Sequence, residues 1–580
     1  MKLIYYTLLA LCPLTGLAQD SAPAVANQYP ADYFRNPLDI PIFLAGNFGE
    51  CRPGHFHSGI DIKTLGVENK PVHAAADGYI SRIKMEKGGF GHALYITHPN
   101  GYTTLYAHLN DFAPEIQKYV RKEQYERKRW DVDLQLLPTQ FPVKKGQQVA
   151  WSGNTGASTA PHLHFEIRNT KTEHPLNPEQ FGMPVVDKLP PVPAEVVFYK
   201  GNIYEDGNLS VSLAKKGSIY KPVRTDDKTF TVSSDTVQVP GGMVGMGVNV
   251  DDYMDGSDNT ITFYTAKLYL DDSLQCMVTL DDIGYDVSRY VNAYTDFKTK
   301  ETKHKWVQLL FQLPGNRLDG IYTRLNANKG RLNLSDGRLH KVAITLTDDK
   351  ENNSNIVFYI SPQPAVADNK PKDDCVPFYA GKTNDFINDP NIKFSLDARQ
   401  LYDDICFHFK ATPDANAYSD RYALHYSYVP LHHYFDLQVK PNKTIPFDLR
   451  SKVVIMYSDG KDEDGRGAPA TDNGWYKASV RNFGSYWLAI DTVPPVIRSL
   501  QKNGASLAKA KQITFEVKDA ITSVRTFSGY LDGKWLCFEQ HGSSFFYKFD
   551  EHCPKGKHQL VFKAEDENGN ENTYKLTFTR

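Results

Sequence analysis

The 580-residue sequence has few cysteines and little net charge, and it has no long apolar run after its N-terminal segment. Its seven cysteines include no C-x-x-C pair, which excludes a cysteine-based zinc ribbon. A formal net charge of -2 gives no reason to expect nucleic acid or an anionic membrane as the main partner. No later stretch approaches the roughly 20 apolar residues of a transmembrane helix. No His-Glu-x-x-His motif occurs either, so the helix-borne type of metalloprotease site is excluded.

The first residues have the pattern of a secretory signal peptide. Lys2 supplies a positive charge, residues 3–11 are apolar, and Gly16-Leu17-Ala18 is a small-x-small cleavage site. We therefore expect residues 1–18 to be removed and the chain to be exported to the periplasm, the cell envelope or the extracellular space. The remaining cysteines are too sparse for a disulfide framework, and Cys537 with Cys553 is the candidate local pair.

Short alternating strands separated by Gly, Asn and Asp turns predict a mainly β protein. A chain of this length divides into about four domains at roughly 150 residues each. We expect an N-terminal antiparallel β domain followed by about three β-sandwich modules, with a linker over residues 363–374. The predicted bounds are 30–185 for the N-terminal domain and 187–362, 375–490 and 491–580 for the modules.

Half of the histidines, nine of eighteen, lie between His55 and His174. On an extended backbone, residues i, i+2 and i+4 share one face, so His57 and Asp61 point the same way. His162 and His164 share a face too, with Leu163 turned toward a core and Gly59 leaving space for a metal. Three protein ligands and an open position are typical of a catalytic zinc, whereas a structural zinc takes four ligands. The pattern indicates a metal hydrolase.

This region resembles the M23 zinc peptidases (LytM and lysostaphin-like) over roughly residues 40–183. The resemblance implies that His57, Asp61 and His164 hold one Zn²⁺ and that His108 and His162 are unliganded catalytic histidines. It also implies an endopeptidase that cleaves peptide bonds in the stems or cross-bridges of peptidoglycan during cell-wall remodelling. The matching motifs occur in the family's order at residues 56–62, 75–78, 101–109, 143–147, 153–156 and 158–166.

The chemistry of these residue types agrees with the resemblance. Zinc lowers the pKa of its bound water to about 7 and polarises the scissile carbonyl. A neutral imidazole can take the proton of that water, and an imidazolium can stabilise the oxyanion or protonate the leaving amine. Which of His108 and His162 performs which step is open.

Two other functions are compatible with parts of the sequence. One is a catalytically silent scaffold that uses the same fold to bind or activate another cell-wall hydrolase. The other is an adhesin whose His-rich domain is incidental, which leaves the ordered motifs unexplained. Silent relatives lose zinc ligands, whereas all five key positions are present here, and this favours the enzyme.

An insertion at residues 111–142 departs from the family pattern. Pro114 begins a predicted helix that continues to Lys128. Because the insertion follows His108 closely, we expect it to form a wall or a lid of the active site that shapes specificity. The alternative is a solvated surface excursion.

Two of the β modules are internal repeats that resemble bacterial immunoglobulin-like domains in architecture. Residues 187–192 (DKLPPV) are echoed by residues 491–496 (DTVPPV), and both modules close on an alternating strand that ends at an aspartate, Asp348 or Asp566. We expect no clustered His, Cys and Asp constellation in residues 187–580. Their expected role is spacing and stabilisation, and the alternative is binding to a cell-wall or envelope partner.

Overall fold

A computed structural model describes residues 29–204, 208–215, 229–232, 236–364, 375–471 and 473–580. The predicted signal peptide and most of the predicted linker lie outside the described residues. The described chain is mainly β, as the sequence predicts, and its longest helix is α1 (Pro114–Arg127). Within the described ranges, no helix is both long and apolar enough to cross a membrane.

Four regions are named as follows for the rest of the description. Residues 29–185 are the N-terminal domain, residues 187–363 are module A, residues 375–490 are module B, and residues 491–580 are module C.

The N-terminal domain is built on a nine-stranded sheet. Seven strands follow the order β1-β4-β13-β8-β7-β6-β10, with every pair antiparallel, and the other two, β11 and β14, pair with β6 and β13. Alternation along β13 turns Leu163, Phe165 and Ile167 into the core, where all three are fully buried. The bounds are β1 (Leu44–Gly46), β2 (Cys51–Arg52), β3 (His55–Phe56), β4 (Ile60–Lys63), β5 (Pro71–His73), β6 (Gly78–Met85), β7 (His92–Thr97), β8 (Tyr102–Ala107), β9 (Leu109–Phe112), α1 (Pro114–Arg127), β10 (Val132–Gln135), β11 (Pro142–Val143), β12 (Gln148–Ser152), β13 (His162–Asn169), β14 (Pro175–Leu176) and η1 (Pro178–Phe181).

The insertion is more than a solvated excursion. Ile116, Val120 and Gln124 of α1 are buried on the N-terminal domain, and β10 and β11 both pair with β6 and so extend the sheet. The chain from Pro71 to Ile80 contributes to two strands, β5 and β6, which belong to different sheets. Residues 74–77 connect the two sheets.

Module A forms one hydrogen-bonded network of twelve strands, with three short helices on the chain between β21 and β22. The hairpin β2–β3 of the N-terminal domain enters its core, because Cys51 and Phe56 belong to the same buried cluster as Tyr294. Its elements are β15 (Val192–Lys200), β16 (Leu209–Lys215), β17 (Thr229–Val232), β18 (Thr236–Pro240), β19 (Met243–Asp251), β20 (Thr265–Leu270), β21 (Ser273–Thr279), α2 (Tyr285–Ser288), α3 (Val291–Tyr294), α4 (Phe297–Lys303), β22 (Val307–Leu309), β23 (Tyr322–Leu325), β24 (Leu332–Asn333), β25 (His340–Thr347) and β26 (Asn353–Gln363).

Modules B and C are sandwiches of mainly antiparallel sheets. Module C packs a four-stranded sheet against a five-stranded sheet around one apolar core. Module B contains β27 (Val376–Phe378), β28 (Asn384–Asp389), β29 (Ile392–Leu396), β30 (Ile405–Phe407), β31 (Phe409–Thr412), β32 (Arg421–Leu424), β33 (Pro430–Val439), η2 (Phe447–Lys452), β34 (Val453–Ser458), β35 (Glu463–Gly467), β36 (Tyr476–Asn482) and β37 (Gly484–Ile490). Module C contains β38 (Val496–Ser499), β39 (Ala505–Ser506), β40 (Gln512–Lys518), β41 (Val524–Leu531), β42 (Lys534–Leu536), β43 (Glu539–His541), β44 (Ser544–Lys548), β45 (Lys557–Asp566) and β46 (Glu571–Thr579).

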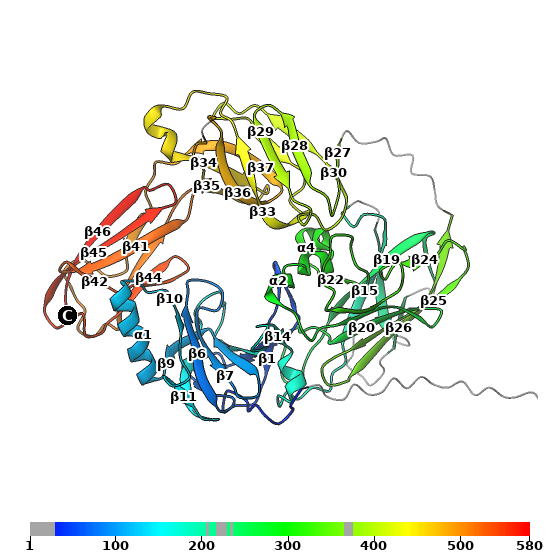
Figure 1. Ribbon diagram of the computed structural model, residues 1–580, viewed down its shortest axis with the longest axis horizontal. Helices are drawn as coiled ribbons and strands as arrows, with labels where there is room; N and C mark the ends of the chain where they lie inside the picture. Colours follow the sequence, from blue (N-terminus) through cyan, green and yellow to red (C-terminus); the bar gives the residue numbers. More distant parts are fainter. Residues whose placement is uncertain (1–28, 205–207, 216–228, 233–235, 365–374, 472) are drawn as a thin grey trace, which may run out of the picture.

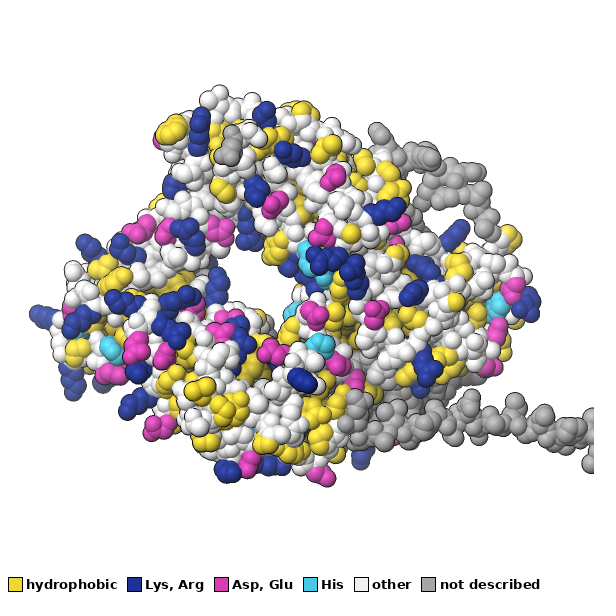
Figure 2. Space-filling model, in the orientation of Figure 1, with side chains coloured by type: hydrophobic (Ala, Val, Ile, Leu, Met, Phe, Trp, Pro, Cys, Tyr) yellow, Lys and Arg dark blue, Asp and Glu magenta, His cyan; other side chains and the backbone are white. Residues whose placement is uncertain are grey.

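The four regions follow one another around a central opening, and module C returns to the N-terminal domain (Figures 1 and 2). The closing contact is made by α1, whose Tyr125 hydroxyl donates to Asp550 Oδ2 at 3.1 Å. Arg121 of the same helix lies 3.5 Å from Glu539 Oε1. The insertion thus carries part of the surface on which module C docks.

The disulfide of the described chain differs from the candidate pair. Cys375 is bonded to Cys406, with Cα atoms 5.4 Å apart, and this bond ties the start of module B to β30. Cys537 and Cys553 are buried free thiols in the structure. The predicted pairing was wrong because a disulfide depends on how close two side chains lie in the folded chain, which nearness in sequence does not determine.

Candidate metal centre

The proposed ligands are brought together by the pairing of β4 with β13. This antiparallel register places Asp61 directly opposite His164, and His162 opposite Lys63. His57 lies three residues before β4 begins, outside any strand. The chain therefore places His57 and Asp61 together through a bend that leads into β4, and not along one continuous strand.

Three ligand atoms converge. His57 Nε2 lies 3.0 Å from Asp61 Oδ1 and 3.0 Å from His164 Nδ1, and His164 Nδ1 lies 2.9 Å from Asp61 Oδ1. All three side chains are buried, with 2–4% of each residue exposed. Four groups of His, Asp and Glu side chains in the described residues could hold a metal ion. Of these, only the group in the N-terminal domain combines two imidazoles with a carboxylate.

The outer partners of the two histidines determine which nitrogen faces the cluster. His57 Nδ1 lies 2.7 Å from the Asn47 carbonyl, so it carries the proton and leaves Nε2 with a lone pair. His164 Nε2 lies 2.8 Å from Glu166 Oε1, so its Nδ1 is the free acceptor. When His164 Nδ1 carries no proton, two lone pairs and a carboxylate oxygen face one another. This set of ligand atoms fits a bound cation. The outer hydrogen-bond partners of the two histidines, a backbone carbonyl and a carboxylate, are those typical of zinc-bound histidine.

The electrostatics of His164 lead to the same conclusion. Burial opposes the charged form of His164, but Asp61 and Glu166 outweigh it and raise its pKa to about 9. Burial instead lowers the pKa of His57 to about 4. The two carboxylates favour one positive charge at this position, which either a proton or a metal ion can supply.

The two predicted catalytic histidines lie beside the trio. The rings of His108 and His162 are 4.7 Å apart, and His162 Nε2 is 3.4 Å from Asp61 Oδ1. Each ring is oriented by a backbone carbonyl: His108 Nδ1 lies 2.8 Å from Thr155 O, and His162 Nδ1 lies 2.8 Å from Ala160 O. Burial, with His164 and His162 nearby, lowers the pKa of His108 to about 3. His108 also has a left-handed backbone, with φ +57°, a strained conformation that occurs at functional sites.

Several residues of the site were not predicted. Glu166 accepts from His164, from Ser58 Oγ at 2.6 Å and from Arg168 Nε at 2.6 Å. Tyr285 of module A donates to Glu166 Oε1 at 2.7 Å and accepts from Arg168 Nη2 at 2.7 Å. Period-two alternation along β13 places Glu166 and Arg168 on the face of His164 and would have found both. No local signal marks Tyr285, which is 119 residues from Glu166.

A second unpredicted contact involves Arg52. Its Nη2 lies 2.6 Å from Asp61 Oδ2 and 3.1 Å from Glu50 Oε2. Arg52 thus binds the oxygen of Asp61 that does not face the histidines. Cys51, beside it in sequence, is packed in the apolar cluster of module A and does not coordinate the trio.

Gly59 has a different role from the one expected. A Cβ at this position would lie 2.3 Å from the Phe165 carbonyl, so a side chain is excluded by the neighbouring strand and not by the metal.

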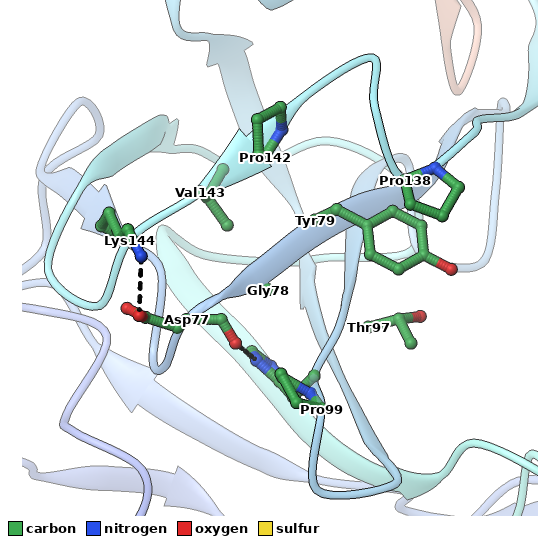
Figure 3. Close-up of a pocket in the computed structure, with 10 residues that line it drawn as sticks. Asp77, Gly78, Tyr79, Thr97, Pro99, Pro138, Pro142, Val143 and Lys144 are labelled. Carbon is green, nitrogen blue, oxygen red and sulfur yellow. Dashed lines mark hydrogen bonds and ion pairs between the residues drawn. The ribbon is translucent and has the colours of Figure 1, made fainter.

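Two motifs of the resemblance form a structural region away from the trio. Asp77 accepts from the Lys145 backbone N–H at 2.7 Å and from Lys144 Nζ at 3.1 Å. Asp77 and Lys144 border a pocket of about 580 Å³ between β6, the end of β7 and β11 (Figure 3). Its lining includes Tyr79 and Pro142 and none of the five predicted site residues.

Comparison with known protein families gives two matches. Residues 55–125 and 135–178 match the model of peptidase family M23, and residues 377–491, within module B, match the Zu5-like domain. The residues between the two M23 segments, 126–134, lie in the insertion.

Similar curated proteins act on or regulate the cell wall. The DD-carboxypeptidase/endopeptidase Mpg of Neisseria meningitidis serogroup B is 36% identical over 128 residues, which are 22% of this chain and 23% of Mpg. The peptidoglycan DD-endopeptidase ShyC of Vibrio cholerae is 30% identical over 142 residues, 23% of this chain and 26% of ShyC. The murein hydrolase activator NlpD of Salmonella dublin is 29% identical over 165 residues, 28% of this chain and 36% of NlpD. The chain thus spans about a quarter to a third of the length of these relatives.

Proposed function

On the premise that the N-terminal domain belongs to peptidase family M23, we propose that this protein is a zinc endopeptidase of the cell wall. Its substrates are the peptide stems or cross-bridges of peptidoglycan, and one Zn²⁺ is held by His57, Asp61 and His164. The observation that carries the proposal is the convergence of three potential ligand atoms at 2.9–3.0 Å, with His108 and His162 beside them.

The chain's own residues have separate tasks in the proposed reaction. A bound Zn²⁺ supplies a water of lowered pKa and polarises the scissile carbonyl. Asn47 and Glu166 hold His57 and His164 in the tautomers that present a lone pair. His108 and His162 present Nε2 toward the site, because a backbone carbonyl holds the proton on Nδ1 of each. A neutral Nε2 can accept the proton of the attacking water, and the protonated ring can then donate to the leaving amine.

A second candidate function comes from the similarity to NlpD, whose name is murein hydrolase activator. In this alternative, the N-terminal domain binds and activates another wall hydrolase and makes no use of the metal. The complete set of five residues favours the enzyme, because an activator has no need of three converging metal ligands or of oriented spare histidines.

The experiment is digestion of purified peptidoglycan by the full-length protein, with and without added zinc, followed by analysis of the released muropeptides. The endopeptidase predicts new amino termini within stem or cross-bridge peptides, which disappear in Asp61→Ala. The activator would be established instead by two results together. The wild-type protein contains zinc but releases no peptide, and the wild type and Asp61→Ala stimulate a separate wall hydrolase equally well.

Export to the cell envelope is part of the proposal, since the substrate lies there. Amino-terminal sequencing of the mature protein from its native host tests the predicted cleavage after Ala18. The modules are proposed to hold the N-terminal domain in a defined orientation, with an envelope partner as the alternative role.

A further inference from the structure

Modules A and C each contain a cluster of three aspartates in the same place. Asp187, Asp252 and Asp348 in module A place carboxylate oxygens within 4.8 Å of one another. Asp491, Asp519 and Asp566 in module C do the same. We expected no such cluster from the sequence, and that expectation was wrong because each trio comes from three distant segments. Neither trio contains a nitrogen or sulfur ligand.

The first and third aspartates make matching contacts in the two modules. Asp187 and Asp491 each accept, through Oδ1, the backbone N–H two residues ahead, at 2.9 and 3.1 Å. Asp348 binds the backbone and side chain of Asn352, and Asp566 binds Asn570 in the same way. The amide of each asparagine also donates to the backbone carbonyl of the first aspartate, at 3.3 and 3.2 Å.

The second aspartate of each trio has an oxygen with no protein donor. Asp252 is fully buried, its Oδ1 accepts from the Tyr253 backbone N–H at 2.9 Å, and its Oδ2 has no hydrogen-bond partner. Asp519 is partly exposed but has the same hydrogen-bond pattern, with Oδ1 bound to backbone N–H groups and a buried, unpartnered Oδ2. A buried carboxylate oxygen without a donor, facing two further carboxylates, is costly unless a cation binds it.

The charge balance in module A is unfavourable without a cation. Burial raises the pKa of Asp252 well above its ordinary value, and Asp348 and Asp187 raise it further. Burial likewise raises the pKa of Asp187, to about 7. Glu179 of the N-terminal domain adds a further buried carboxylate, whose nearest cation, Lys350 Nζ, is 3.6 Å away.

We propose that each aspartate trio binds one Ca²⁺ ion, at the junction between its module and the region before it. Oxygen-only ligands suit a hard cation, and calcium tolerates the irregular geometry of three segments with backbone carbonyls nearby better than magnesium does.

The position of the trios gives the ions a structural role. Asp187 follows Val185, which bridges to Ile42 of the N-terminal domain, and Asp491 directly follows β37 of module B. The loops that hold the third aspartates also contact the preceding region. Asp349 accepts from Asn177 and Gln180 of the N-terminal domain, and Asn568 exchanges hydrogen bonds with Lys452 of module B. A bound ion therefore stiffens both junctions and, through them, the ring.

The test is calorimetric titration of CaCl₂ into the full-length protein, stripped of calcium and loaded with one zinc. Two ions should bind, with dissociation constants of about 10⁻⁴–10⁻³ M, as for other extracellular modules. Asp252→Asn and Asp519→Asn should each leave one ion, and the double variant none. The control is Asp403→Asn, which alters a buried aspartate with an unpartnered Oδ2 that belongs to no such trio and should keep two ions.

A thermal unfolding series with 10 mM CaCl₂, on the order of ten times the expected dissociation constant, gives the second readout. Calcium should raise the unfolding midpoint of the wild type and of Asp403→Asn but not of the double variant. If Asp252→Asn does not fold, Asp519→Asn decides the matter in module C. No calcium binding by the wild type, unchanged stoichiometry in Asp519→Asn, or tighter binding of MgCl₂ than of CaCl₂ would overturn the proposal.

Discussion

Modules A and C both contact the N-terminal domain, but they reach different parts of the candidate site. Module A contacts the residues that orient two of the three ligands. Tyr285 bonds to Glu166, which holds His164, and the Thr262 backbone pairs with the side chain of Asn47, whose carbonyl holds His57.

Module C contacts α1 and residues near His108, one of the two histidines proposed to be catalytic. Glu539 Oε2 lies 3.6 Å from His92 Nε2, and the His92 backbone N–H donates to Thr155 Oγ1 at 2.9 Å. Thr155 is the residue whose carbonyl orients His108. We infer that module A supports metal binding, whereas module C affects the shape of the molecule around the site.

The largest effect is expected at the centre that both modules surround. Asp61→Ala removes the anionic ligand, so zinc content should fall and hydrolysis of peptidoglycan should drop more than about 1000-fold, because the metal contributes several kcal/mol to the transition state. His57→Ala and His164→Ala should behave alike. Metal analysis with a muropeptide assay measures both effects. Wild-type protein that purifies without zinc and gains no activity when zinc is added would contradict the assignment.

Substitution of the two proposed catalytic histidines should reduce turnover without reducing metal binding. His108→Ala and His162→Ala should keep near-stoichiometric zinc while hydrolysis falls about 10²–10⁴-fold, the usual contribution of acid–base groups. The matched comparison is His57→Ala, which should lose both. Zinc loss in His108→Ala equal to that in His57→Ala would show that His108 is a ligand.

The contribution of module A should appear as a moderate loss of zinc affinity. Tyr285→Phe removes the hydroxyl that bridges Glu166 and Arg168, so His164 is held less firmly, and we expect roughly a tenfold weaker zinc affinity. Competition with a chelator measures this. Tyr290→Phe is the control, because its ring stacks on His432 of module B, at 4.0 Å, and has no contact with Glu166. Equal affinities in both variants would confine the support of the metal to the N-terminal domain.

The same division explains how much of the site could be predicted from the sequence. The mainly β fold was predictable, because strand alternation and turn residues are local signals. Four residues of the candidate site could be named from the sequence because they occur in two short motifs: His57, Asp61, His162 and His164. Tyr285 and the aspartate trios were not, since only the folded chain brings their segments together. The helix over residues 114–127 was predictable from Pro114, whereas the partner of that helix, module C, was not.

The expectation that the insertion walls or covers the active site remains a prediction, and the structure adds a contact that bears on it. Tyr125 stacks on His552 with ring centroids 3.5 Å apart and bonds to Asp550. Because α1 is held by module C, any change in access that involves the insertion requires movement of module C as well.

The smallest effect on hydrolysis is therefore expected from Tyr125→Ala. This change should weaken the contact between α1 and module C that closes the arrangement of the four regions. Loss of one stacked pair and one hydrogen bond removes about 1–2 kcal/mol, enough to shift the balance between closed and open forms roughly tenfold. Small-angle X-ray scattering should show a larger radius of gyration. Hydrolysis of a short peptide should change less than twofold, while intact peptidoglycan, which must approach past the surrounding modules, should be cleaved faster. Lys122→Ala is the control on the same helix, since its exposed side chain pairs only with Glu126 among the described ion pairs. A wild-type scattering curve that does not fit the closed ring, or equal radii for the two variants, would show that Tyr125 does not hold module C in place.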